Sequence, residues 1–210
     1  MFKSIAENAS SEIVEKKSKF IGNVYYIETI EEAEELIKQA NKTYFDARHN
    51  CYAFRVYTQN GIVNRFSDDG EPSGTAGSPM LNLLTSQNLA NVLIIVTRYF
   101  GGILLGTGGL VKAYTAASME ALRQTKIVEK ALGEEVELFV RYPDLEKMKY
   151  YFRQKNIHIN NLEYGENVSV TAEMTHLQLE SLLENRRNLN FTLLEYKIIA
   201  PKFIKINIDA

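Results

Sequence analysis

The side chains best suited to chemistry are three carboxylates in a glycine-rich loop, those of Asp68, Asp69 and Glu71. Carboxylates at this spacing could share a hard cation or transfer protons. The ligand spacing of an EF-hand is not present, and Asp and Ser in turns usually bond their own backbone. The pattern therefore favours a self-bonded turn over metal binding or acid/base chemistry. The candidate surface residues of this loop are Asp68, Asp69, Glu71, Gly74, Thr75 and Gly77.

A second glycine-rich segment holds five of the chain's 12 glycines, all between Gly101 and Gly109. It matches neither common nucleotide motif, because the P-loop lysine is missing and Val111 replaces the third glycine of the dinucleotide pattern. Its backbone amides, with Arg98 before them and Lys112 after them, could contact an anion such as a nucleic-acid phosphate. The alternative is that glycine only permits close helix–sheet packing. The candidate residues here are Arg98, Tyr99, Gly101, Gly102, Gly106 and Lys112.

His49 and Cys51 are two positions apart in a predicted strand, so their side chains share one face. Roughly 7 Å separates such neighbours, which is too long for a thiol–imidazole hydrogen bond. A catalytic Cys–His pair is therefore disfavoured. His49 is either a site residue or a hydrogen-bonded structural histidine, and the structural interpretation is favoured.

Composition limits the class of protein. The chain has 210 residues, 45% of them hydrophobic, and a formal net charge of −2, which gives no whole-protein argument for binding nucleic acid or membranes. Its one cysteine excludes an internal disulfide framework and fits a reducing compartment. No apolar run approaches the roughly 18 residues that span a bilayer. We expect a monomeric cytoplasmic protein without membrane association.

The N-terminal half alternates between strand and helix signals. Thr29 precedes an acidic first turn and predicts a helix cap, and Pro79 suits a first helical position. The continuous apolar run at 92–97 predicts a strand covered on both faces. Gln59-Asn60-Gly61 predicts a hairpin turn. The predicted strands are a pair within 10–27, then 50–58, 62–66 and 92–97; the predicted helices are 29–41, 79–87 and 110–123.

The C-terminal half predicts the order β-α-β-β-α-β, which is typical of a ferredoxin-like domain. We therefore expect two domains, residues 1–130 and 131–210. Basic residues with Tyr150, Tyr151 and Phe152 between them could bind and stack on bases, although a solvated face is favoured. The predicted strands are 135–140, 157–164, 167–174 and 191–199; the predicted helices are 142–154 and 175–188.

The N-terminal half contains three distinctive segments: DARHNCYAF at 46–54, SDDGEP and GTAG within 67–77, and RYFGG and LG within 98–106. These segments resemble motifs of the YigZ/IMPACT family. The resemblance implies a mixed α/β (α+β) fold: an N-terminal domain of the kind found in a small-subunit ribosomal protein and in domain IV of elongation factor G, with a left-handed βαβ crossover. It also implies a ferredoxin-like C-terminal domain similar to domain V of that factor.

The resemblance further implies a link to translation. Eukaryotic IMPACT proteins regulate translation by competing for an activator of the kinase that phosphorylates an initiation factor. They carry an additional N-terminal partner-binding domain, which we do not expect here. The family implies no catalytic residues, and a dipeptidase activity is disfavoured because no metallopeptidase ligand set is visible.

We therefore expect a binding or regulatory protein that contacts RNA, a ribosomal complex or a translation factor through the two loops, with His49 at their edge. No cofactor or metal is expected. The alternative is a small-molecule hydrolase in which Asp68, Asp69, Glu71 and His49 use a metal or act on a phosphate-containing substrate. A deep pocket with convergent carboxylates would favour the hydrolase, and a shallow cleft with exposed amides and flanking Arg or Lys would favour binding.

Overall fold

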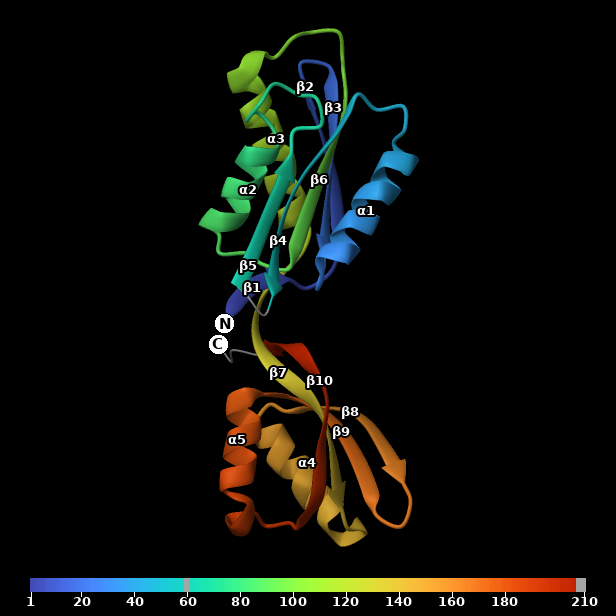
Figure 1. The fold of residues 1–210 in the computed structure, drawn as a ribbon, viewed down its shortest axis with the longest axis vertical. Helices are drawn as coiled ribbons and strands as arrows, with labels where there is room; N and C mark the ends of the chain where they lie inside the picture. The colour runs from blue at the N-terminus through green and yellow to red at the C-terminus, as the bar shows by residue number, and fades with distance from the viewer. Residues whose placement is uncertain (59–60, 207–210) are drawn as a thin grey trace. The chain divides into compact units, whose positions relative to one another are not determined.

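The computed structural model describes residues 1–58 and 61–206 and divides into two compact units (Figure 1). One unit comprises Phe2–Val128, and the other comprises Met1 with Glu129–Ala210. Each unit contains a sheet, its own helices and its own buried cluster of apolar side chains. The predicted mixed α/β class is therefore confirmed.

The N-terminal unit is built on a five-stranded sheet in the order β2-β3-β6-β4-β5. Every neighbouring pair in it is antiparallel. The strands are β2 Ala9–Glu15, β3 Ser18–Tyr26, β4 His49–Thr58, β5 Gly61–Ser67 and β6 Val92–Tyr99. Strand β6 is central, which fits the continuous apolar run that predicts it.

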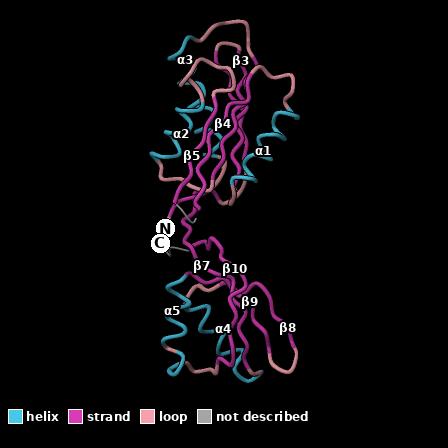
Figure 2. The backbone as a smooth tube through the Cα atoms, in the orientation of Figure 1, coloured by secondary structure: helices cyan, strands magenta, loops and turns pink. Residues whose placement is uncertain are grey.

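Helices cover both faces of this sheet (Figures 1 and 2). Ile94 and Val96 of β6 belong to the cluster with the second and third helices, whereas Leu93 and Ile95 belong to the cluster with the first. The prediction that β6 is covered on both faces is confirmed. The helices are α1 Ile30–Thr43, α2 Gly77–Ser86 and α3 Gly106–Arg123.

Small residues allow α3 to lie directly on the sheet, as the sequence predicts. Ala113, Ala117 and Ala121 are buried in the interface. Opposite them, a Cβ atom added to Gly22 of β3 would lie 2.6 Å from the carbonyl oxygen of Ala117. The helix and the strand therefore meet at backbone distance.

The observed helix boundaries agree only in part with those predicted from the sequence. The predicted cap of α1 is confirmed, since Thr29 Oγ1 accepts a hydrogen bond of 3.1 Å from the backbone of Glu32. Helix α3 begins at Gly106 and not at 110, so the end of the predicted glycine loop is its first turn. Helix α2 begins at Gly77, which makes Pro79 its third residue. A first-turn N–H has no helical acceptor, so proline is still tolerated there.

The N-terminal strand β1, Phe2–Ile5, is not predicted by the sequence. Phe2 and Ile5 are buried, and the backbone N–H of Ala90 donates to Lys3 at 2.9 Å. In the predicted hairpin turn, residues 59 and 60 lie outside the described part of the chain. The strands on either side pair as expected, with Thr58 opposite Gly61.

The C-terminal unit has the predicted β-α-β-β-α-β order. Within its sheet, β10, β7, β9 and β8 pair antiparallel in that order, and Met148, Phe152 and Leu182 from the helices lie in its core. The strands are β7 Ile127–Val140, β8 His158–Tyr164, β9 Val168–Thr175 and β10 Leu193–Ile206; the helices are α4 Leu145–Gln154 and α5 His176–Glu184.

Strands β7 and β10 are both longer than predicted, because Glu129–Gly133 pairs with Lys202–Ile206. Helix α5 is shorter than predicted, and a separate 3-10 turn follows it at Arg186–Asn188. Among the helices of residues 1–58 and 61–206, none is both long and apolar enough to cross a bilayer.

The close approach of β3 and α3 makes a testable prediction. Gly22→Ala should lower the free energy of unfolding by about 1–3 kcal/mol, because the new methyl group overlaps the α3 backbone. Urea denaturation followed by circular dichroism measures this change.

Gly108→Ala is the matched control, since Gly108 lies in the first turn of α3 and a Cβ there meets nothing within 4 Å. It should stabilise the protein by up to about 1 kcal/mol, because alanine has the higher helix propensity. Equal effects of the two substitutions would show that the interface is not tightly packed.

Candidate functional site

The two glycine-rich segments line the same pocket of the N-terminal unit, which has a volume of about 480 Å³. Gly70, Glu71 and Pro72 come from the acidic loop, and Leu104, Leu105, Gly106 and Thr107 come from the second segment. Strands β4 and β6 add His49 and Arg98 near their ends, Arg48 directly precedes β4, and Phe100 and Leu110 complete the wall.

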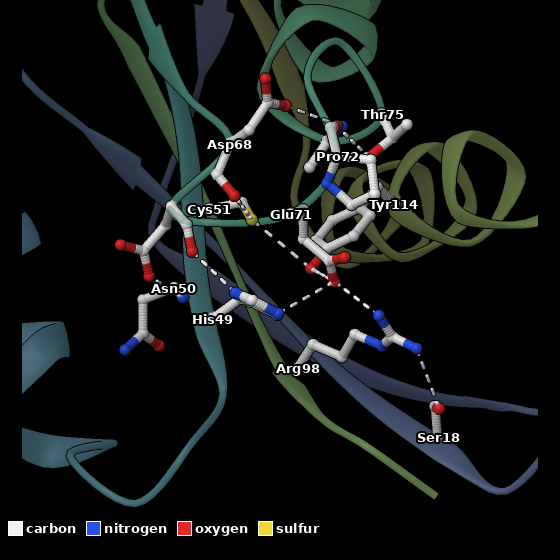
Figure 3. A network of polar contacts seen from close by, with 12 residues as sticks. Ser18, His49, Asn50, Cys51, Asp68, Glu71, Pro72, Thr75, Arg98 and Tyr114 are labelled. Atoms are coloured by element: carbon white, nitrogen blue, oxygen red, sulfur yellow. Dashed lines mark hydrogen bonds and ion pairs between the residues drawn. The ribbon is translucent and has the colours of Figure 1, made fainter. Parts of the chain in front are cut away.

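Glu71 is the buried centre of this site. Only 3% of its side chain is exposed, and Arg98 Nη1 donates to its Oε1 at 2.6 Å (Figure 3). The hydroxyl group of Tyr114, on α3, donates to the same oxygen at 2.8 Å. These contacts join the acidic loop to β6 and α3 and balance the carboxylate charge.

The guanidinium group of Arg98 is buried and its charge is paired with Glu71, whereas its Nε has no hydrogen-bond partner among the described residues. Its Nη2 donates to Ser18 Oγ at 3.4 Å, and its guanidinium lies 5.5 Å from the ring centre of Phe20 and 5.6 Å from that of Phe100. Ser18 Oγ also accepts from the backbone of Gly101 at 3.2 Å. Arg98 was expected to be a phosphate contact, but its charge is already paired with Glu71.

His49 lies at the edge of the pocket with 12% of its side chain exposed. Its Nδ1 is 2.7 Å from the backbone oxygen of Asp69, and its Nε2 is 3.8 Å from Glu71 Oε1. Cys51 bonds elsewhere: its thiol donates to the backbone oxygen of Asp68 at 3.0 Å and contacts the Tyr114 hydroxyl at 3.4 Å. The prediction against a direct Cys–His pair agrees with these contacts.

Burial keeps the inner hydrogen-bond donors protonated. It raises the pKa of the Cys51 thiol to about 12, with a further contribution from the nearby Glu71 carboxylate. Burial likewise raises the pKa of Tyr114, as do its contacts with Cys51 and Glu71. Neither group supplies an anionic nucleophile near neutral pH.

The carboxylates of Asp68 and Asp69 are turned to the backbone. Asp68 Oδ1 accepts from Ala76 and Gly77 at 3.0 and 2.8 Å, and its Oδ2 accepts from Gly74 at 2.8 Å. Asp69 Oδ2 accepts from Asn50 at 2.6 Å. The interpretation of this loop as a self-bonded turn fits these contacts. Among the residues that the structure describes, no three His, Cys, Asp or Glu side chains are placed to hold a metal.

The positive end of α3 lies at the pocket. Its cap residue, Leu105, has no capping side chain, and no acidic residue lies in the first turn. The exposed Arg48 packs its guanidinium 5.4 Å from the Phe100 ring centre. Among the described residues, no carboxylate pairs with Arg48. The mouth of the pocket is therefore electropositive.

The other predicted site residues have structural or peripheral positions. Thr75 Oγ1 donates to Pro72 at 2.6 Å within the loop, and Tyr99 donates to Asp46 at 2.8 Å. A side chain at Gly101 would collide with the backbone of Lys17. Predicted residues that do not line the pocket are Asp68, Asp69, Gly74, Thr75, Gly77, Tyr99, Gly101, Gly102 and Lys112.

Sequence reasoning missed Arg48, Phe100, Leu104 and Tyr114 as parts of the site. Arg48 and Phe100 lie inside two of the recognised motifs, so a motif-based search could have included them. Tyr114 is a large aromatic residue on an otherwise small-residue helix face, which is a weaker signal.

Some of the basic residues of the C-terminal unit pair with nearby carboxylates. Arg141 pairs with Asp144 at 3.2 Å, and Lys149 pairs with Glu146 at 2.8 Å. Phe152 is buried in the core. These partners favour the predicted solvated face over a nucleic-acid surface on α4.

The fold and the loop pocket define a two-unit α/β protein with a candidate binding site, and comparisons identify its family. The model of the Impact N-terminal domain matches residues 16–122, and that of a domain of unknown function, DUF1949, matches residues 138–184. IMPACT family member YvyE of Bacillus subtilis (strain 168) is 39% identical over 165 residues, 79% of this chain and 76% of the relative. The chain belongs to the IMPACT family.

Other similar proteins agree with this assignment. IMPACT family member YigZ of Escherichia coli (strain K12) is 39% identical over 71% of this chain and 74% of its own. A crystal structure of a hypothetical protein matches 99% of this chain and 98% of its own, with 30% identity and a TM-score of 0.61. The two-domain translational regulator Yih1 matches with a TM-score of 0.35 and 22% identity, which is too low to support an argument.

The buried ion pair predicts that replacing Arg98 destabilises the protein much more than replacing the exposed Arg123. Arg98→Met should cost about 3–5 kcal/mol of unfolding free energy, because it leaves the Glu71 carboxylate buried without its cation. Arg123→Met, which breaks an exposed pair with Glu120, should cost at most about 1 kcal/mol.

Chemical denaturation of both variants measures these values. The double variant Glu71→Leu with Arg98→Met should recover part of the loss, because no unpaired charge remains. Similar losses for Arg98→Met and Arg123→Met would contradict the assigned role of the pair.

The raised pKa of Cys51 predicts low thiol reactivity. Below pH 9.0, the ordinary value, the protonated thiol stabilises the fold, and this contribution is lost as the pH rises towards 12. Between pH 7 and 9, a disulfide reagent should react slowly with the native protein and rapidly in denaturant. Fast labelling of native protein at pH 8 would contradict the buried environment.

Proposed function

We propose that this protein is a binding protein linked to the regulation of translation, and that its N-terminal pocket receives a phosphate group of RNA. The link to translation is taken from membership of the IMPACT family. The single observation that carries the binding site is the N-terminus of α3, without a capping side chain, beside Arg48, for which the described part of the chain supplies no carboxylate partner.

The start of α3 supplies the first part of an anion site. Backbone N–H groups in the first helical turn have no acceptor within the helix, and the helix dipole adds a partial positive charge. Gly106 and Thr107, at this end, line the pocket, and no side chain caps it. A phosphate oxygen is a suitable acceptor for such amides.

Arg48 supplies the second part. Its side chain is exposed and lies against Phe100, while Arg98 on the neighbouring strand is neutralised by Glu71. Among the described residues that line the pocket, Arg48 is therefore the arginine whose charge is available to a ligand. Guanidinium groups bind phosphate oxygens with two parallel hydrogen bonds.

The hydrolase alternative has less support. It needs the carboxylates of Asp68, Asp69 and Glu71 to converge on a substrate, but the first two accept backbone hydrogen bonds and only Glu71 lines the pocket. One ion-paired carboxylate with adjacent amides and an arginine is closer to the arrangement expected for binding.

Several related expectations stay predictions. They are the likeness to domains IV and V of elongation factor G, the left-handed crossover, a monomeric state, a cytoplasmic location and contact with a ribosomal complex or translation factor.

The test is the salt dependence of binding to single-stranded RNA. If Arg48 contacts one phosphate, Arg48→Ala should reduce the slope of log affinity against log salt by about 0.7–1. Fluorescence anisotropy with a labelled oligoribonucleotide, at several salt concentrations, measures this slope.

Arg123→Ala is the control, since Arg123 lies in the last turn of the same helix α3 and is exposed. It should leave the slope unchanged. Absence of RNA binding at low salt, or equal changes in slope for both variants, would refute the proposed contact.

A further inference from the structure

A carboxylate oxygen and an imidazole nitrogen face each other at the pocket wall. Glu71 Oε1 and His49 Nε2 are 3.8 Å apart, too far for a direct hydrogen bond. Both residues line the pocket, and each is at least partly shielded from solvent, with 3% and 12% of the side chain exposed.

The backbone of Asp69 fixes which nitrogen of His49 faces the pocket as an acceptor. A carbonyl oxygen can only accept, so Nδ1 must donate to Asp69 across the 2.7 Å contact. In the neutral ring, Nε2 then carries a lone pair beside Glu71. In that ring, Nε2 is therefore available to accept a hydrogen bond from a ligand.

Glu71 adds an unused acceptor. Its contacts with Arg98, Tyr114 and His49 all end on Oε1. Among the described residues, no donor reaches Oε2, although Glu71 as a whole is only 8% exposed. Oε2 is therefore an available acceptor at the pocket, to which a ligand hydroxyl group can donate.

We propose that the pocket binds a ribose-phosphate unit, with the ribose 2′-hydroxyl donating to Glu71 or His49 and the adjacent phosphate at the start of α3. This rests on the proposed function and specifies its ligand chemistry. The pocket therefore selects RNA over DNA, because the 2′-hydroxyl is the group that distinguishes them.

The remaining wall suits the rest of a nucleotide. Phe100 is 39% exposed and Leu104 is 82% exposed, and Arg48 lies on the Phe100 ring. Bases stack on aromatic side chains and on guanidinium planes. A volume of about 480 Å³ lies within the range of small-molecule sites, about 300–1,000 Å³.

The experiment compares three oligonucleotides of one sequence: RNA, 2′-deoxy and 2′-O-methyl. The methyl ether keeps the oxygen but removes the donor, so it isolates the proposed hydrogen bond. We expect RNA to bind about tenfold more tightly than either analogue, since a hydrogen bond to a charged group is worth about 1.5 kcal/mol. Adenosine 3′-monophosphate and its 2′-deoxy form, in parallel, show whether a free nucleotide suffices.

His49→Phe removes the acceptor and keeps a ring of similar shape, so the preference for RNA over the 2′-O-methyl analogue should fall. His49→Gln retains a side-chain acceptor and should keep part of that preference. Because the readout is a ratio of affinities for one variant, partial unfolding does not change it. An unchanged ratio in His49→Phe would overturn the role of His49.

Gly108→Asp tests the phosphate position without weakening the fold. The new carboxylate at the start of α3 suits the helix dipole, so stability should not fall, while binding of every oligonucleotide should weaken by several fold. Gly108→Asn is the neutral control of the same size and should bind more tightly than Gly108→Asp.

The outcomes separate the two proposals. Equal binding of RNA, 2′-deoxy and 2′-O-methyl chains would overturn the ribose inference and leave the proposed phosphate contact standing. No binding of any chain at low salt would overturn both.

Discussion

The buried ion pair between Glu71 and Arg98 is the constraint on which the site depends. Two opposite charges removed from water are tolerated only when each is paired and hydrogen-bonded. Arg98 reaches Glu71 at 2.6 Å, and Tyr114 donates to the same carboxylate at 2.8 Å. The acidic loop, the end of β6 and the middle of α3 must therefore keep their relative positions, and the pocket between the loops exists because they do.

Local signals predicted much of the fold. The apolar run of β6 and the cap at Thr29 of α1 are encoded within a few residues, and both are confirmed. Strand β1 and the extensions of β7 and β10 were missed, because their pairing partners lie far away in the sequence. The start of α3 was missed because three glycines in four residues predict a loop, whereas the burial of Leu105 and Leu110 favours the helix.

In the candidate site, too, local contacts could be predicted from the sequence and long-range contacts could not. The local preference of Asp in turns predicts that Asp68 bonds its own loop, and Asp68 does accept a hydrogen bond from Gly74. The sequence does not show which opposite charges meet in the fold. Arg98 was therefore expected to contact a ligand, whereas in the structure it pairs with Glu71. Because Arg98 is paired with Glu71, the charge that is available to a ligand is that of Arg48.

The three backbone hydrogen bonds accepted by Asp68 have a consequence for recognition. They close the acidic loop, so that its pocket-lining residues Gly70, Glu71 and Pro72 are held in shape before any partner arrives. Association is weakened when flexible segments must become ordered, and a preorganised loop avoids most of that entropic loss. Affinity at this surface is therefore governed by the contacts themselves, and a rigid-body encounter is sufficient to form them.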